Sequence, residues 1–310
     1  YNGSIFTMDM PAGVMGFDRP KGGPVSPDGR DWAQLSFMWQ NTRHPYWSMP
    51  ARGDYDTITP GMRFVRDSLE IAIDRCRKLY GIDGAVIFEA SWLHNVGVFP
   101  FEGMPGHLRF HQLATIEIPA IMAETYAHTR DQKFLEDVRL PCAEAGLKFY
   151  FNRFPKTDAA GKMRMEGVGC AETFQGVTNP ATEIGCLKYL LDQLLSFPLD
   201  EPRRATFAKW RAMLPDVPVR RIRGMDLLAV GEVYDPGRVD CETPEMYSVY
   251  PFRQAWLGTP DKLAMARQSF HVRNSSLDGT VDWQPVETGG WQSAPVQAAY
   301  LGLAREAARL

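Results

Sequence analysis

Residues 180–197 read PATEIGCLKYLLDQLLSF, and this stretch decides the expected fold class. Its large apolar side chains recur every three or four residues, which places them on one face of an α-helix. They are Ile184, Leu187, Leu190, Leu191, Leu194 and Leu195. Pro180 precedes the pattern, where proline favours a helix start. The stretch therefore predicts a helix that packs its apolar face against other helices.

The same apolar spacing recurs along most of the chain, whereas strand patterns are almost absent. The only strand that we expect is a short one near Ile5, within a segment rich in Gly and Pro over residues 1–28. The further helices are predicted over 31–40, 59–80, 107–129, 131–151, 200–214, 243–256, 260–273 and 295–310. Prolines at 119 and 141 predict a kink or break in two of them.

The loops between these helices alternate between short and long. Connections at 129–131 and 197–199 are short, whereas 81–106, 155–180, 215–243 and 274–294 are long and rich in Gly, aromatic and acidic residues. Such alternation is typical of helical hairpins stacked in a ring with the long loops on one face, where functional groups concentrate. We therefore expect an all-α fold, an (α/α)₆ toroid over residues 29–310. About nine helices are predicted and twelve close such a ring, so the expectation includes an incomplete toroid.

Composition excludes several classes of protein. The chain of 310 residues is 45% hydrophobic and 23% charged, as in ordinary globular proteins, and its net charge is −3. This charge provides no cationic field for nucleic acid, and no apolar run approaches the roughly 18–20 residues of a membrane span. Motifs for dinucleotides, phosphate loops, zinc peptidases and serine hydrolases are absent. The five cysteines contain no CxxC pair and are predicted to be buried free thiols. We expect no cofactor and no metal.

Aromatic residues beside polar residues indicate carbohydrate binding, because sugar rings have apolar faces and hydroxyl edges. The densest such stretch is WQNTRHPYW over residues 39–47, in which Pro45 predicts an irregular backbone. A helix end with exposed polar groups is the alternative interpretation. Glu89 follows the apolar run 85–88, so it is either a desolvated carboxyl or the partner of an arginine. His111 lies four residues after His107, and a packing or substrate role is preferred over a metal site.

Two later stretches carry candidate acid and base groups. Glu172 follows the small residues of 167–171, and a half-buried carboxyl in such a loop suits a general acid, although a capping role is the alternative. Residues 232–245 hold five carboxyls. Some of these are explained as charges at a helix N-terminus. Asp235, Asp240 or Glu242 could be the second carboxylate of a pair and activate water.

Residues 40–43, QNTR, together with Tyr46-Trp47 and Gly53-Asp54, resemble a stretch of bacterial glycoside hydrolases related to family 95 α-L-fucosidases. The stretches 2–6, 172–175, 242–251 and 291–304 are similar to the same group. The resemblance implies an (α/α)₆ toroid flanked by β domains, with Glu172 as the general acid and Asn41 orienting water. The catalytic aspartate of that group corresponds loosely to Asp235. Trp39 stands in place of a second asparagine, and residues 240–242 replace a His-Arg-His stretch. With these departures the resemblance implies a fucosidase- or galactosidase-like activity rather than fucose specificity alone.

These observations predict an exo-acting, inverting glycosidase for an oligo- or polysaccharide. Glu172 protonates the leaving oxygen, and a carboxylate among Asp235, Asp240 and Glu242, helped by Asn41, directs water at the anomeric carbon. The remaining expected substrate contacts are Trp39, Gln40, Arg43, His44, Trp47, Glu89, Trp92, His111, Gln175, Asp240 and Trp291. A polysaccharide lyase on a similar toroid and a non-catalytic carbohydrate-binding domain are the alternatives. Missing flanking β domains or a second copy of the chain would complete the protein. A periplasmic or secreted location follows from the substrate class alone.

Overall fold

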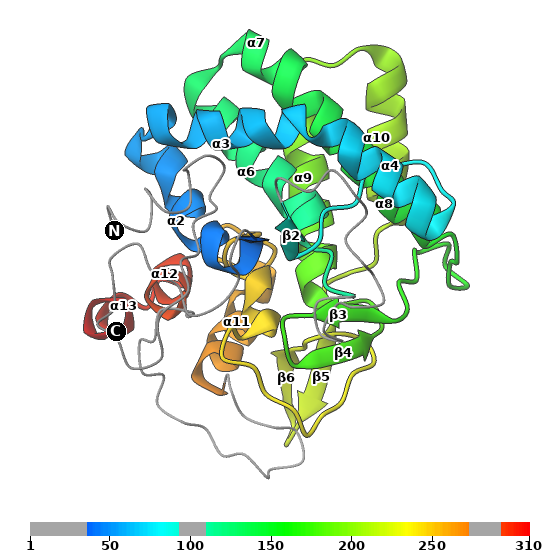
Figure 1. Ribbon diagram of the computed structural model, residues 1–310. Coiled ribbons are helices and arrows are strands. Elements are labelled where there is room, and N and C mark those ends of the chain that lie inside the picture. Colours follow the sequence, from blue (N-terminus) through cyan, green and yellow to red (C-terminus); the bar gives the residue numbers. More distant parts are fainter. Residues whose placement is uncertain (1–35, 93–109, 273–292) are drawn as a thin grey trace, which may run out of the picture. The chain divides into compact units, whose positions relative to one another are not determined.

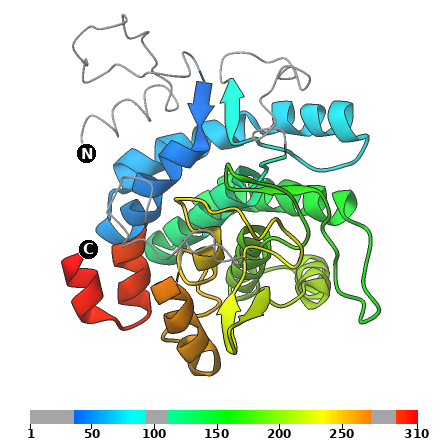
Figure 2. The same cartoon turned by 90° about the horizontal axis from the view of Figure 1, so that it is seen from below.

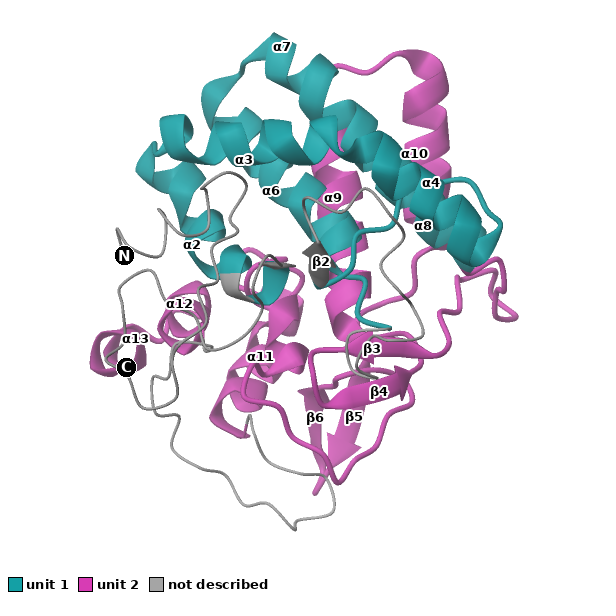
Figure 3. Cartoon of the chain, in the orientation of Figure 1, with its two compact units in different colours: residues 1–153 teal, residues 154–310 magenta. Residues whose placement is uncertain are grey.

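The computed structural model describes residues 36–92, 110–272 and 293–310, which are mostly helical as expected for an all-α fold (Figure 1). The chain divides into two compact units, residues 1–153 and 154–310 (Figure 3). The expected segment 1–28 and its strand lie outside the described residues. Three small two-stranded antiparallel sheets with strands of three or four residues accompany the helices in the described part, and none of these short strands was expected.

The first unit contains a hairpin and a layer of helices. Its elements are β1 (Ser36–Met38), α2 (Trp39–Arg52), α3 (Tyr55–Asp67), α4 (Leu69–Tyr80), β2 (Ala90–Trp92), α6 (Ala114–Thr129), α7 (Gln132–Phe134), the π-helix η2 (Leu135–Arg139) and α8 (Leu140–Arg153). β1 pairs with β2 with Phe37 opposite Ser91, as the blue and cyan arrows of Figure 2 show. The helix predicted over 31–40 is therefore wrong at residues 36–38, because a partner more than fifty residues away sets the local backbone.

The helix predicted over 59–80 begins earlier and is divided. α3 starts at Tyr55 and ends at Asp67, and α4 begins at Leu69. Ser68 joins them with a backbone φ of −86°. Gly81 ends α4 in the left-handed conformation with φ +67°, as its position predicted.

Helix α6 forms the centre of the first unit. Every residue from 114 to 126 is buried, so the helix is covered all round rather than on one face. Pro119 lies inside it without ending it. Proline lacks the N–H that would bond the carbonyl of Thr115. At that oxygen α8 approaches closely, since a Cβ on Gly146 would lie 2.6 Å from it.

Prolines also fail to interrupt α2. Pro45 and Pro50 both lie inside this helix, so the irregular backbone predicted over 39–47 is wrong. Ser48 donates from Oγ to the carbonyl of Pro45 at 2.8 Å. A proline costs one helical hydrogen bond and a steric clash, and the packing of α2 against α6 and α3 compensates for that cost.

The second unit contains the helices that the sequence predicted best. Its elements are β3 (Val168–Cys170), β4 (Phe174–Val177), α9 (Ala181–Leu195), α10 (Glu201–Met213), β5 (Val219–Ile222), β6 (Met225–Leu228), the 3₁₀-helix η3 (Pro244–Ser248), α11 (Pro260–Val272), α12 (Ala294–Tyr300) and α13 (Ala304–Arg309). Asp200 caps α10 by accepting a hydrogen bond from the backbone N–H of Arg203 at 2.9 Å.

Two predictions in this unit need correction. The helix expected over 243–256 is only the short η3, and the backbone beyond it leaves helical geometry, with Arg253 at a left-handed φ of +54°. The helix expected over 295–310 is divided into α12 and α13, and Gly302 lies between them with φ +70°. Helix α9 is present as predicted, but residues 181–191 are all buried, so it is a central helix rather than one with an exposed polar face.

A small apolar cluster supports the loops of the second unit. It consists of Cys170, Phe174, Val177 and Val230, with Tyr234 packed against it. It fixes the hairpin β3–β4 to the segment that follows β6. Among the described residues no helix combines the length and the apolar character that crossing a membrane requires.

We expect Gly146→Ala to lower the free energy of unfolding by about 1–3 kcal/mol, as overpacking does in a tight core. The added methyl would lie 2.6 Å from the Thr115 carbonyl, which is backbone and cannot rotate away. Lys148→Ala, at an exposed position of the same helix, is the control and should change stability by less than about 0.5 kcal/mol. Equal stability of the two variants in urea unfolding would contradict the close approach of α6 and α8.

Candidate functional site

Carboxyl groups from two loops of the second unit converge, and we call the group Glu172, Asp240, Cys241 and Glu242 the acidic loop cluster. Thr173 connects the loops, because its backbone N–H and its hydroxyl oxygen lie 3.1 and 2.9 Å from Oδ2 of Asp240. Oδ1 of Asp240 accepts from the N–H of Glu242 at 2.9 Å. The turn that carries Glu172 is thereby held against residues 239–242.

The members of the acidic loop cluster differ in exposure. Glu172 is exposed, so the half-buried carboxyl expected at this position is wrong, whereas Asp240 and Glu242 are buried. Tyr247 donates its hydroxyl to Oε2 of Glu242 at 2.8 Å. The cluster thus pairs a carboxyl that solvent and ligands can reach with a buried carboxylate held by a neutral donor, an arrangement that suits proton transfer to and from a bound molecule.

Cys241 reports the electrostatics of the cluster. Cys241 is exposed, unlike the four other cysteines, so the expectation of a buried thiol is wrong here. Partial burial raises the pKa of its thiol to about 11, with further increases from the charges of Asp240, Glu242 and Glu172. A negative charge disfavours formation of a neighbouring thiolate. The charge of Glu172 thus acts on Cys241, which lies on the other loop.

Backbone strain occurs at both loops of the cluster. Ala171, which precedes Glu172, has φ +53°, and Thr243, which follows Glu242, has φ +50°. A left-handed conformation is unfavourable for residues with a Cβ, above all for a β-branched residue such as threonine. Strain of this kind costs about 1–3 kcal/mol and concentrates at functional sites. The two strained residues therefore favour a functional role for this place in the fold.

Two further candidates of the second unit lie beside the cluster. Asp235 is exposed and closes its own turn by accepting from Nε of Arg238 at 2.9 Å and from the N–H of Gly237 at 3.0 Å. Gln175 is exposed, and its side-chain amide donates to the backbone carbonyl of Glu172 at 3.0 Å. Gln175 thus stabilises the turn that presents Glu172, while Asp235 is engaged with an arginine.

In the first unit five predicted residues come together round Glu117, and we call the group the tryptophan–glutamate cluster: Trp39, Arg43, Trp47, Glu89, His111 and Glu117. Glu117, in the first turn of α6, is its centre. The indole N–H groups of Trp39 and Trp47 donate to Oε2 and Oε1 of Glu117 at 2.6 and 2.9 Å. Nε of Arg43 forms an ion pair with the same carboxylate at 3.0 Å.

Glu89 is the second buried carboxylate of this cluster. It forms an ion pair with Arg43, so the interpretation of Glu89 as the partner of an arginine is confirmed. Nε2 of His111 lies 3.8 Å from its other oxygen. The backbone of Glu89 is also held, because the backbone N–H of Trp39 donates to the backbone carbonyl of Glu89 at 2.7 Å.

The tryptophan–glutamate cluster is a packed interior. Trp39 is 1% exposed and Trp47 is 8% exposed, so both rings contact protein and not solvent. Gln40 is also buried. Burial, and then the charge of Arg43, lowers the pKa of His44 to about 4, so this ring is neutral at pH 7. The roles of these residues in substrate binding stay predictions, whereas their role in holding α2 against α6 is visible in the contacts.

Some predicted residues lie outside what the structure describes. Asn41 is part of α2 and Trp92 ends β2, but neither side chain is described, and Trp291 lies outside the described residues. Sequence reasoning missed Glu117, Thr173 and Tyr247. A signal for Glu117 was available, since it is the lone acid in the apolar stretch 113–123 and a buried charge requires partners.

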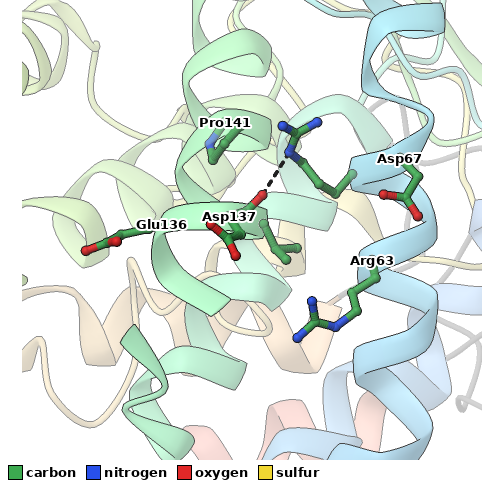
Figure 4. Close-up of a pocket in the computed structure, with 7 residues that line it drawn as sticks. Arg63, Asp67, Glu136, Asp137 and Pro141 are labelled. Carbon is green, nitrogen blue, oxygen red and sulfur yellow. Dashed lines mark hydrogen bonds between the residues drawn. The ribbon is translucent and has the colours of Figure 1, made fainter. Parts of the chain in front are cut away.

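A polar groove of about 460 Å³ lies in the first unit between α3 and the segment η2–α8 (Figure 4). Arg63, Arg66, Asp67, Glu136, Asp137, Val138 and Pro141 line it. A hydrogen bond across the groove joins its two walls. Pro141 has no N–H for the carbonyl of Asp137, and Arg66 donates to that oxygen from Nε at 2.8 Å. Its lining offers neither an aromatic ring for a sugar nor an excess of positive charge for an anion.

Among the described residues no three His, Cys, Asp or Glu side chains are grouped as metal ligands. No protein-family model matches the chain, and no curated protein matches its sequence. The acidic loop cluster is therefore assigned on its geometry.

We expect Glu117→Gln to lower the free energy of unfolding by about 3 kcal/mol. The substitution removes a negative charge that pairs with the buried Arg43, and it places an amide N–H₂ donor against an indole N–H donor. Glu136→Gln, an exposed site in η2, is the matched control with a change below about 0.5 kcal/mol. Urea unfolding followed by tryptophan fluorescence measures both. A Glu117→Gln protein as stable as the control would contradict the tryptophan–glutamate cluster.

We expect Cys241 to be alkylated slowly by iodoacetamide at pH 8, since with a pKa of about 11 on the order of one thiol in a thousand is ionised. Glu172→Gln removes one negative charge and should accelerate the reaction. Asp226→Asn, which removes an exposed carboxylate paired with Arg221, is the control and should leave the rate unchanged. The same rate in the Glu172→Gln and Asp226→Asn proteins would show that Glu172 lies away from Cys241.

Proposed function

We propose that this protein is a glycoside hydrolase that cleaves a glycosidic bond of an oligo- or polysaccharide with inversion. The observation that carries the proposal is the acidic loop cluster, in which Thr173 joins the turn of the exposed carboxyl Glu172 to the loop of the buried carboxyls Asp240 and Glu242. The resemblance of residues 40–43 and 172–175 to glycoside hydrolases of the (α/α)₆ type supports it. The proposal includes closure of the helices into such a toroid.

The proposed reaction uses Glu172 as the general acid. Its carboxyl gives a proton to the glycosidic oxygen as the bond from that oxygen to the anomeric carbon breaks. A water molecule forms the new bond to the anomeric carbon from the opposite face, and a second carboxylate takes the proton that this water loses. Inverting enzymes hold their two carboxyls about 6.5–9.5 Å apart to leave room for the water.

The exposure of the carboxyls supports this division of roles. An acid must contact the leaving group, and Glu172 is the exposed member of the acidic loop cluster. Asp235, the third carboxylate considered from the sequence, is already occupied by Arg238 and its own turn. Asp240 and Glu242 therefore remain as the two candidates for the second carboxylate.

The test is Glu172→Gln assayed on aryl glycosides and on plant, algal and host glycans. We expect kcat to fall by at least a factor of about 10², with little change in melting temperature because the side chain is exposed. Glu166→Gln, an exposed carboxylate on the preceding loop that pairs with Lys156 and Arg164, is the matched control and should retain activity.

Two results would overturn the proposal. One is full turnover by the Glu172→Gln protein, and the other is a wild-type chain that hydrolyses no glycan of the panel. A product that absorbs ultraviolet light through a new double bond would replace hydrolysis with a lyase reaction. Proton NMR of the first-formed product reads the anomeric configuration and checks inversion.

A further inference from the structure

The two buried carboxylates of the acidic loop cluster have different surroundings. Both oxygens of Asp240 accept hydrogen bonds that hold the backbone, Oδ1 from Glu242 N–H and Oδ2 from Thr173 N–H. Turning this side chain towards a water molecule would break hydrogen bonds that join the two loops. The structure thus gives Asp240 the task of holding the loops together.

Glu242 is held in another way. Its Oε2 accepts from the hydroxyl of Tyr247, five residues later, and both side chains are buried. This contact joins Glu242 to a side chain of η3, and its own side chain is one methylene longer than that of Asp240. The contacts between Asp240 and Thr173 join the two loops, so a movement of the Glu242 carboxyl towards a water molecule leaves those contacts in place.

Tyr247 is a rigid support for this carboxylate. It lies in η3, and its ring packs on Phe252 with the ring centroids 5.9 Å apart. Phe252 in turn fills the space beside Gly185 of the central helix α9, where a Cβ would approach its ring carbon to 3.1 Å. A hydroxyl fixed through such packing holds its hydrogen-bond partner in one orientation.

We propose that Glu242 is the base of the reaction and that Tyr247 is its positioning residue, while Asp240 holds the loops. The inference rests on the proposed glycosidase function and narrows its second carboxylate to one residue. The Tyr247 hydroxyl directs Glu242 and stabilises its charged form. A donor to a carboxylate favours that form over the protonated acid.

Other ionisable groups lie close to Glu242. Asp240 and Cys241 are on its own loop, the charge of Glu172 acts together with that of Glu242 on the Cys241 thiol, and Glu245 is in η3 with Tyr247. Tyr247→Phe keeps all of these groups and the aromatic ring, so it isolates the effect of one hydroxyl.

The experiment compares kcat/KM against pH in the wild type and the Tyr247→Phe protein. Without the donor the charged form of Glu242 is less stable, so the carboxylate takes up its proton at a higher pH. The acidic limb of the kcat/KM profile should shift to higher pH by about half to one pH unit. The decrease in kcat should be larger than the change in KM. Tyr150→Phe, which removes a buried hydroxyl bonded to the Gln112 carbonyl, is the control whose acidic limb should stay in place.

A second measurement separates this inference from the proposed function. In protein labelled with ¹³C at glutamate carboxyls, the resonance that is missing from the Glu242→Gln protein identifies Glu242. The pH at the midpoint of the titration of this resonance should be higher in the Tyr247→Phe protein, whether or not any glycan is cleaved. An unchanged midpoint overturns the role of Tyr247. Retained turnover by Glu242→Gln overturns the assignment of the base, whereas retained turnover by Glu172→Gln overturns the glycosidase proposal itself.

Discussion

A carboxylate buried in protein must receive hydrogen bonds or ion pairs, and each unit of this protein is organised round such groups. Burying an unpaired charge costs several kcal/mol. In the first unit Glu117 and Glu89 meet this constraint by collecting two indole N–H groups and the guanidinium of Arg43. Helix α2, the residue before β2 and the first turn of α6 are brought together by these contacts.

In the second unit the same constraint produces a different result. Asp240 takes its donors from backbone N–H groups and from Thr173, so satisfying one carboxylate joins two loops. Glu242 takes a donor from Tyr247. These loops carry left-handed non-glycine residues at 171 and 243. The surrounding hydrogen bonds hold a conformation that the residues themselves disfavour, which is what a preorganised site requires.

Prolines and glycines act together in the packing of the first unit. Pro119 and Pro141 each leave a carbonyl without its helical N–H partner. At Pro119 the freed carbonyl faces Gly146, whose lack of a Cβ allows a second helix to approach. At Pro141 the chain forms a π-helical turn and Arg66 donates to the free oxygen. A residue that breaks an isolated helix is thus accommodated where a neighbouring segment supplies the space or the donor.

The sequence by itself determined the helical class, the positions of α9, α10 and α11, and the end of α4 at Gly81, because apolar periodicity and capping residues act over a few neighbours in the chain. It also identified Glu172, Asp240 and Glu242 as acids of interest. Only the tertiary structure decided that residues 36–38 pair with 90–92, that Pro45 stays inside a helix and that 243–256 is mostly irregular. It alone decided that Trp39 and Trp47 are buried on Glu117. Strand pairing and the burial of charge depend on partners distant in the sequence, and no local pattern contains those partners.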